Sequence, residues 1–211
     1  SLEKVNPFAV CNFDNNWRAS NDDTGGTPGK QNSIYSLATD TISPNLIKVL
    51  VNSITEIEAV FNEGMDFGSL FSATYTINNS ITIDSVQLDS NNYYGLKLFI
   101  SPISAGVIYT LTIDSVMDCP GNNIDKNIAD FVLPENGEPG DLIINEVLFN
   151  PSLSASDDFV EVYNNSSKYI DISEWSLANY DFDLDSIDNV KLVGGQQHIL
   201  YPQTYALVTE D

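Results

Sequence analysis

Short runs in which apolar and polar residues alternate recur along the whole chain, with turn residues between them. In Glu56–Phe61, for example, Ile57, Ala59 and Phe61 fall on one face, as in a half-buried β-strand. Helical periodicity is almost absent, and strands of this kind need a second sheet to cover them, so the pattern predicts an all-β sandwich. The other predicted strands are Leu46–Val51, Ser72–Ile77, Thr82–Leu88, Tyr94–Ile100, Tyr109–Val116, Phe131–Leu133, Leu142–Phe149, Phe159–Asn164, Trp175–Asn179, Val190–Val193 and Tyr205–Thr209.

Two stretches rich in proline and glycine indicate where one domain ends and the next begins. The sequence LPENGEPGD at Leu133–Asp141 cannot continue a strand, and it predicts a linker at residues 134–140. A less sharp boundary lies at Gly25–Ser36. These boundaries predict a closing segment at residues 1–33, a complete β domain at 36–135 and the beginning of another at 141–211.

The charge of the chain narrows the choice of partners. Eight basic residues stand against 30 acidic ones, which gives a formal charge of −22. Affinity for phosphate comes mainly from Lys and Arg, so we expect no nucleic-acid partner. No apolar run reaches the length of a membrane span, so we expect no membrane insertion in this part of the protein. No signal peptide is visible at the first residues, which leaves export open because the chain is expected to begin inside a domain.

The two cysteines are too few for a disulfide framework. Cys11 and Cys119 could pair across segments, or both could be small buried thiols. The sequence alone therefore leaves the redox compartment open.

The middle segment resembles the bacterial Ig-like domains of surface and exported proteins. FNEGMD at 61–66 is similar to a strand end of that family, and YTLTIDSVMDCPGNNI at 109–124 is similar to its closing strand and the turn that follows. The resemblance covers about residues 36–135 and implies an Ig-like β-sandwich. The cysteine in DCPGN departs from the more common apolar residue at that place.

Both flanks resemble the lamin tail domain of bacterial secreted proteins. GDLIINEVLFNP at 140–151, DFVEVYNNSSKYIDISEWSLAN at 158–179 and YALVTED at 205–211 look like its first strands, and SLEKVNP at 1–7 with NNWRASNDDTGGTPGKQNS at 15–33 looks like its end. The resemblance implies a second, incomplete β-sandwich and a longer parent protein in which these modules alternate. It also implies an extracellular or cell-surface location, in the periplasm or at the outer membrane.

The sequence contains few residues or motifs that could carry out catalysis. His198 is the one histidine, and neither zinc-ligand spacing nor a nucleophile motif occurs. Glu146 and Glu161 could form a carboxylate pair for acid–base work, but they would need a third group and a cleft. We therefore predict that the chain is not an enzyme.

Calcium is the one ion for which the sequence offers candidate ligands. Asp181, Asp183 and Asp185 alternate as the first three ligands of a calcium loop do. The motif is not an EF-hand, because Ser186 stands where Gly is needed and Leu192 where a bidentate Glu is needed. A polar loop of an acidic protein is the alternative.

Aromatic residues offer a candidate glycan contact. Tyr93 and Tyr94 follow the polar sequence SNN and could stack on a sugar ring, as aromatics of carbohydrate-binding modules do. Trp17 and Trp175 are predicted instead as core anchors of their segments. Either this glycan contact or calcium binding would make the chain a binding accessory module attached to an enzyme elsewhere in the parent protein.

The leading hypothesis is a non-catalytic structural or adhesive module of a large exported bacterial surface protein, which spaces or presents other domains. Its partners would be other domains of the same parent chain and a surface glycan or protein. Incomplete domains expose strand edges and apolar faces, so self-association is also predicted.

Overall fold

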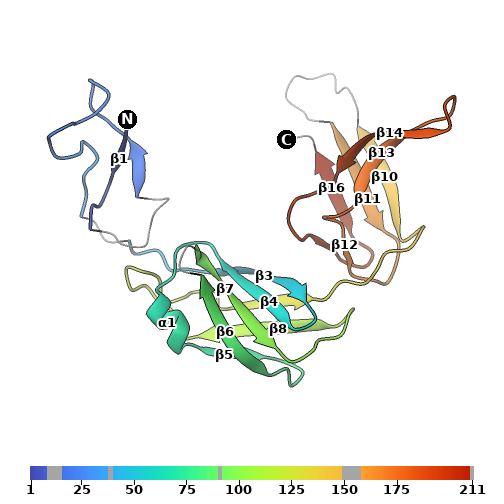
Figure 1. The fold of residues 1–211 in the computed structure, drawn as a ribbon, viewed down its shortest axis with the longest axis horizontal. Coiled ribbons are helices and arrows are strands. Elements are labelled where there is room, and N and C mark those ends of the chain that lie inside the picture. Colours follow the sequence, from blue (N-terminus) through green and yellow to red (C-terminus); the bar gives the residue numbers. More distant parts are fainter. Residues whose placement is uncertain (9–15, 38–39, 90–91, 149–157, 210–211) are drawn as a thin grey trace. The chain divides into compact units, whose positions relative to one another are not determined.

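The computed structural model describes residues 1–8, 16–37, 40–89, 92–148 and 158–209. It divides the chain into two compact units, one built from residues 1–103 and 109–131 and the other from residues 104–108 and 132–211. Each unit consists of antiparallel strands, which confirms the predicted all-β fold (Figure 1). Among the described residues, none of the helices has the length and hydrophobicity of a membrane span.

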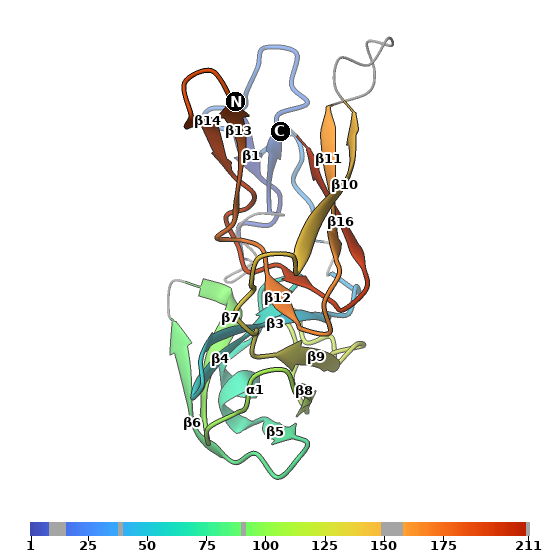
Figure 2. The same cartoon turned by 90° about the vertical axis from the view of Figure 1, so that its right-hand side faces the viewer.

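The first unit contains a sandwich of two antiparallel sheets. One sheet has the order β3-β4-β7-β6 and the other the order β5-β8-β9 (Figures 1 and 2). The strands are β3 (Leu46–Ser53), β4 (Glu56–Phe61), β5 (Thr74–Ile77), β6 (Ile83–Asp89), β7 (Asn92–Ile100), β8 (Ile108–Asp114) and β9 (Ile128–Val132).

The core of this sandwich follows the alternation in the sequence. Ile57, Ala59 and Phe61 of β4 are buried, as predicted, and so are Leu111 and Ile113 of β8. Each of these side chains points between the two sheets because successive residues of a strand face opposite sides. The apolar face of each sheet thus covers that of the other, as in Ig-like domains.

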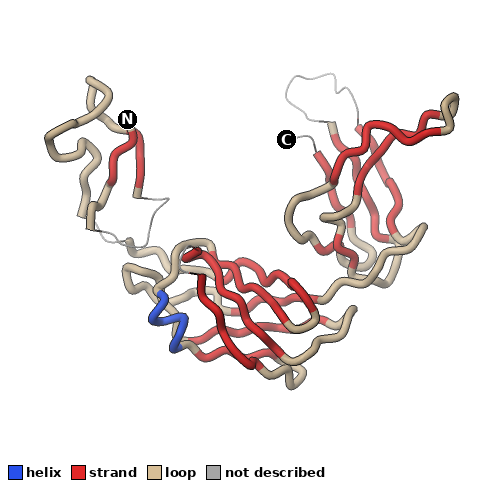
Figure 3. The backbone as a smooth tube through the Cα atoms, viewed as in Figure 1, coloured by secondary structure: helices blue, strands red, loops and turns tan. Residues whose placement is uncertain are grey.

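A short helix that the sequence analysis did not predict precedes β5. Helix α1 (Phe67–Ser72) is the blue segment in Figure 3, and β5 begins two residues after it, at Thr74. The carboxylate of Asp66 accepts a hydrogen bond from the amide of Ser69 at 2.7 Å, which caps the first turn. The predicted strand at Ser72–Ile77 was therefore wrong at its first two residues.

Residues 1–37 also belong to the first unit and form a small hairpin of their own. Strand β1 (Leu2–Lys4) pairs with β2 (Trp17–Ala19). Trp17 is 49% exposed, so the expectation that it plugs a core is wrong for this structure. Glu3 and Asn16 are buried here instead, and the carboxylate of Glu3 accepts hydrogen bonds from Thr27, Ser20 and Ser33. These bonds, with that of Thr27 first, lower the pKa of Glu3 to about 2.

The second unit holds three small antiparallel sheets. Their orders are β10-β11-β16, β12-β15 and β13-β14 (Figure 1). Its buried apolar cluster consists of Val162, Ile170, Ile172 and Leu200, and Trp175 packs against this cluster as a partly buried anchor. The strands are β10 (Leu142–Leu148), β11 (Phe159–Asn164), β12 (Ile170–Asp171), β13 (Ser176–Asp181), β14 (Ser186–Leu192), β15 (Ile199–Leu200) and β16 (Tyr205–Thr209).

Candidate functional site

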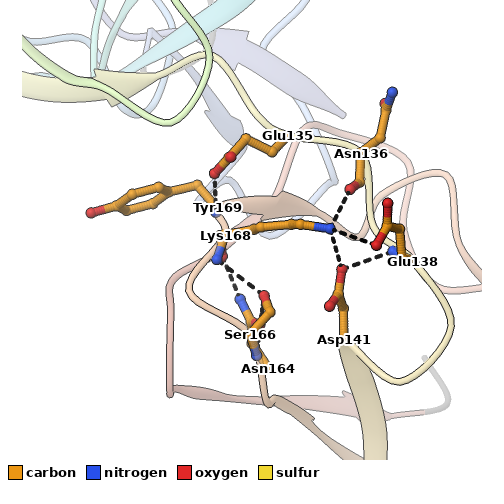
Figure 4. Close-up of polar contacts among 8 residues, drawn as sticks. All are labelled: Glu135, Asn136, Glu138, Asp141, Asn164, Ser166, Lys168 and Tyr169. Carbon is orange, nitrogen blue, oxygen red and sulfur yellow. Dashed lines mark hydrogen bonds and ion pairs between the residues drawn. The ribbon is translucent and has the colours of Figure 1, made fainter.

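A group of polar contacts in the second unit joins residues 135–141 to the turn between β11 and β12. We call this group of contacts the clasp; it comprises Glu135, Asn136, Glu138, Asp141, Lys168 and Tyr169 (Figure 4). Strand β11 ends at Asn164 and β12 begins at Ile170, so Lys168 and Tyr169 lie in a short turn. The turn presents them to residues that precede β10.

Lys168 is the centre of the clasp. Its ammonium lies 2.8 Å from Oδ2 of Asp141 and 3.5 Å from Oε2 of Glu138, and it donates a hydrogen bond of 3.3 Å to the carbonyl of Asn136. The hydrogen bond with Asp141 is the main reason that the pKa of Lys168 lies above its ordinary value and that of Asp141 below it. Each group thus holds the other in its charged form.

Glu135 adds a second attachment through the backbone. Its amide donates to the carbonyl of Tyr169 at 2.8 Å, and its carboxylate accepts from the amide of Tyr169 at 3.2 Å (Figure 4). The amide of Glu138 in turn donates to Oδ2 of Asp141 at 2.8 Å. The predicted linker therefore has no strand of its own, yet its backbone is held at both ends.

Close packing fixes the middle of the same segment. A Cβ atom on Gly137 would lie 2.5 Å from Cζ2 of Trp175, so a side chain at this position would displace the indole ring. Glycine is therefore the residue that lets the backbone approach Trp175 this closely.

Asn164 secures the turn from the other side. It is fully buried, and its Nδ2 donates to the carbonyls of Lys168, Leu200 and Tyr201 at 2.8, 3.0 and 3.1 Å. Its Oδ1 accepts hydrogen bonds from the amide and hydroxyl of Ser166. One side chain thereby ties the end of β11 to the clasp turn and to the residues that follow β15.

The chemistry of the clasp is that of a structural joint. Its single cation, Lys168, is paired with the carboxylates of Asp141 and Glu138, and the carboxylate of Glu135 binds the backbone of Tyr169. A general base or nucleophile would need a partner for proton transfer and room for a substrate. The neighbouring cavity of about 170 Å³ is lined mainly by apolar side chains, among them Ile144, Ile172 and Trp175.

The candidate calcium residues lie in the hairpin turn between β13 and β14. Oδ1 of Asp181 accepts from the amides of Asp183 and Leu184 at 2.8 and 3.0 Å, and Asp185 accepts from the hydroxyl of Tyr180. Within the described ranges no group of three or more His, Cys, Asp or Glu is arranged to hold a metal ion. The Asp181 carboxylate shapes the turn, and calcium binding by this loop stays a prediction.

The candidate glycan residues lie at the start of β7. The ring of Tyr93 stacks on that of Phe67, with centroids 4.5 Å apart and planes inclined by 11°. The amide of Tyr94 donates to Oδ1 of Asn92. Both tyrosines are half-buried, and Tyr93 helps to hold α1 against the sheet. Glycan binding by the pair stays a prediction.

The structure also places the residues considered for catalysis. Glu146 and Glu161 are directly paired across β10 and β11, and Glu161 accepts a hydrogen bond from Asn145 at 2.5 Å. His198 is exposed, and its backbone binds Asp171 and Ile172. These three residues are not brought together with a nucleophile. The clasp itself was not among the sequence-predicted sites.

Cys119 is disulfide-bonded, and the described residues include no free cysteine. Cys11, the other cysteine of the sequence, lies outside the described residues.

Comparisons with known proteins bear on the second unit most directly. Residues 135–211, which begin at the clasp, match the family model of the Lamin Tail Domain. No curated protein matches the chain.

Two solved structures are similar to most of the chain. One is the N-terminal part of the bacterial S-layer protein SbsC, with a TM-score of 0.40 and 15% identity over 81% of this chain and 45% of that one. The other comprises domains 1–6 of the surface layer protein SbsC, with a TM-score of 0.40 and 13% identity over 80% of this chain and 26% of that one. The chain thus spans less than half the length of either. Taken with the strands and the clasp described above, the family match identifies residues 135–211 as a lamin tail domain.

Proposed function

We propose that the chain is a non-catalytic structural part of a large exported surface protein, in which the clasp fixes the first residues of the lamin tail domain to the body of that domain. The observation that carries this proposal is the Lys168–Asp141 pair together with the two Glu135–Tyr169 hydrogen bonds. A domain that spaces or presents others needs an end that stays folded onto its own body. The clasp holds residues 135–141 against the turn between β11 and β12 of the same domain.

The chemistry of the polar side chains supports a structural role. The carboxylates of Glu3, Asp66 and Asp141 accept hydrogen bonds from backbone or neighbouring side chains. Each of these groups closes a turn or a segment of its own unit. This use of acidic residues is typical of a scaffold, since a catalytic carboxylate is kept accessible to a substrate.

The strongly negative charge fits a protein that works in solution at a surface. A net charge far from zero keeps a protein soluble and disfavours unspecific association with anionic surfaces. The role as a spacer therefore needs no additional ligand, while an adhesive contact would use a surface glycan or protein.

Amide hydrogen exchange in the complete chain tests the joint directly. We expect the amides of Glu135, Glu138 and Asp141 to be protected in the wild type and to lose protection in Asp141→Asn, which removes the charge that Lys168 binds. Asp183→Asn is the matched control, since Asp183 lies in the exposed β13–β14 turn. Free exchange of residues 135–141 in the wild type would contradict the proposal.

Two assays separate this function from its alternatives. A glycan array should show no binding that depends on Tyr93 and Tyr94, and binding that disappears in Tyr94→Ala would favour an accessory module. Hydrolytic turnover that disappears when Glu146, Glu161 or His198 is replaced would show an enzyme.

A further inference from the structure

We propose that Glu63 is a proton-operated switch at the end of the central sandwich where the chain enters β3. The proposal concerns the first unit and is independent of the clasp. It rests on one buried carboxylate that has no hydrogen-bonding partner among the described residues, near a second carboxylate that has several.

Glu63 lies two residues beyond β4, in a closely packed segment. Its side chain is 7% exposed, and its neighbours Phe61 and Met65 are 2% and 0% exposed. Met65 forms an isolated antiparallel bridge with Asp118, which follows β8 and is 1% exposed. Two acidic residues that are far apart in the sequence are thereby enclosed in the same part of the sandwich.

Both carboxylate oxygens of Asp118 accept hydrogen bonds. Its Oδ1 accepts from the amides of Gly121 and Asn122 at 2.8 and 2.7 Å, and its Oδ2 accepts from Nδ2 of Asn122 at 2.7 Å. The same Nδ2 also donates to the carbonyl of Asp40 at 3.1 Å. The carboxylate of Asp118 thus organises residues 118–122 and links them to the segment before β3.

Glu63 has no such support. Within the part of the chain that the structure describes, its carboxylate makes neither a hydrogen bond nor an ion pair. The charged groups that act on it from the surrounding segments are Asp118 and Asp40, and both are acidic. Burial, followed by these two charges, raises the pKa of Glu63 to about 7.

Loss of the proton therefore places a second negative charge beside Asp118 in a buried position. The contacts that this repulsion would weaken are the hydrogen bonds between α1 with its cap and the backbone of Met117. Asp66 and Ser69 bind the backbone of Met117 through the Asp66 amide and the Ser69 hydroxyl, at 3.0 and 3.1 Å. These contacts hold α1 to the segment that carries Asp118, so repulsion between Glu63 and Asp118 would loosen α1 and residues 117–124.

The direction of the pH effect follows from the raised pKa. A carboxyl group that binds its proton more tightly in the folded state stabilises that state fully below its ordinary value of 4.5. This contribution is lost as the pH rises through about 7. Residues 117–124 should thus be well protected from hydrogen exchange in a mildly acidic medium and less protected above neutral pH.

A titration of the carboxyl carbons by NMR in the complete chain tests the proton site. We expect one glutamate signal with a midpoint near 7 that is absent in Glu63→Gln and present in the control Glu58→Gln. Glu58 is the control because it lies on β4 and is only half-buried. A midpoint near 4.5 for Glu63 would overturn the proposal.

Hydrogen exchange tests the structural consequence. Protection factors of residues 117–124 should fall between pH 6 and pH 8.5 in the wild type and in Glu58→Gln, and stay constant in Glu63→Gln. Equal behaviour of all three proteins would overturn the proposal. So would a fall that millimolar calcium prevents in the wild type alone, because the site would then bind a divalent cation in place of the proton.

Discussion

The central sandwich and the lamin tail domain are both antiparallel β structures, yet they hold themselves together differently. In the sandwich, strands from both sheets contribute fully buried apolar side chains such as Phe61, Leu98 and Ile113. In the lamin tail domain, the buried apolar cluster has four members, and Ile144 and Val147 of β10 remain 60% and 50% exposed. The first unit is thus stabilised mainly by its apolar core.

The lamin tail domain compensates with directional polar contacts. Its fully buried Asn164 and the Lys168 clasp fix the turn between β11 and β12 and residues 135–141. Apolar burial tolerates small shifts, while hydrogen bonds and ion pairs require a particular geometry. The comparison predicts that the two units will respond to different kinds of substitution.

The largest effect is expected from truncation of the apolar core. Phe61→Ala should lower the free energy of unfolding of the sandwich by about 3–5 kcal/mol, because it removes a ring and leaves a cavity. Urea unfolding followed by NMR signals of each unit measures this effect. The control Phe182→Ala removes a ring that is 87% exposed and should change little. An equal loss in both units would contradict separate cores.

Removal of the buried amide of the lamin tail domain should have the next largest effect. Asn164→Ala leaves the carbonyls of Lys168, Leu200 and Tyr201 without their donor, and we expect a loss of about 2–3 kcal/mol. The same urea titration measures it from signals of β11 and β16. Asn145→Ala, which removes a single exposed hydrogen bond, is the matched control. If the two variants were equally stable, the tie through Asn164 would not be a main support of this domain.

The contrast between the units also explains what the sequence could predict. Alternation gave the bounds of β4 and β11 correctly, because burial on one face of a strand leaves a period of two residues in the sequence. Helix α1 was missed because it is only six residues long and depends on its Asp66 cap and on the contact of Ser69 with Met117. Strands of two or three residues, such as β12, leave no period to detect.

The sequence pattern could not predict the contacts of the clasp or the burial of Glu63, and the reason is a different one. Lys168 lies 27 residues from Asp141 and 32 from Asn136, and no motif connects them. Glu63 stands in a strand end that the sequence marks as polar, and its burial arises from the approach of the segment around Asp118. Sites of this kind depend on tertiary contacts, which the pattern of a single strand does not record.

A smaller effect is expected from removal of the clasp lysine. Lys168→Met should weaken the attachment of residues 135–141 and make it less sensitive to pH, because the hydrogen bond from the amide of Glu138 to Asp141 remains. In the wild type, the lowered pKa of Asp141 makes the clasp strongest above the ordinary value of 3.8, and its contribution is lost as the pH falls through the folded-state pKa. The raised pKa of Lys168 has the opposite sense, so the contribution persists at high pH until the lysine loses its proton.

Hydrogen exchange of the amides of Glu135, Glu138 and Asp141 as a function of pH measures this change. The control Lys191→Met removes a lysine of the exposed strand β14 and should keep the acid dependence of the wild type. If Lys168→Met also kept it, the clasp would not depend on the ion pair.

The smallest effect is expected from an ion pair of the sandwich, which provides the sharpest contrast with the clasp. Lys97 on β7 lies 2.8 Å from Glu56 on β4, the same separation as in the Lys168–Asp141 pair. Lys97 is more exposed than Lys168, with 46% against 26% of its side chain accessible, and solvent screens such a pair strongly. The strands that carry Lys97 are also held by the apolar core and by the ladder of β4 and β7. Lys97→Met should therefore leave exchange in β4 and β7 unchanged at physiological salt, while Lys168→Met releases residues 135–141. Similar losses in the two variants would show that ion pairs serve both units alike and that the difference in core size does not decide where polar contacts matter.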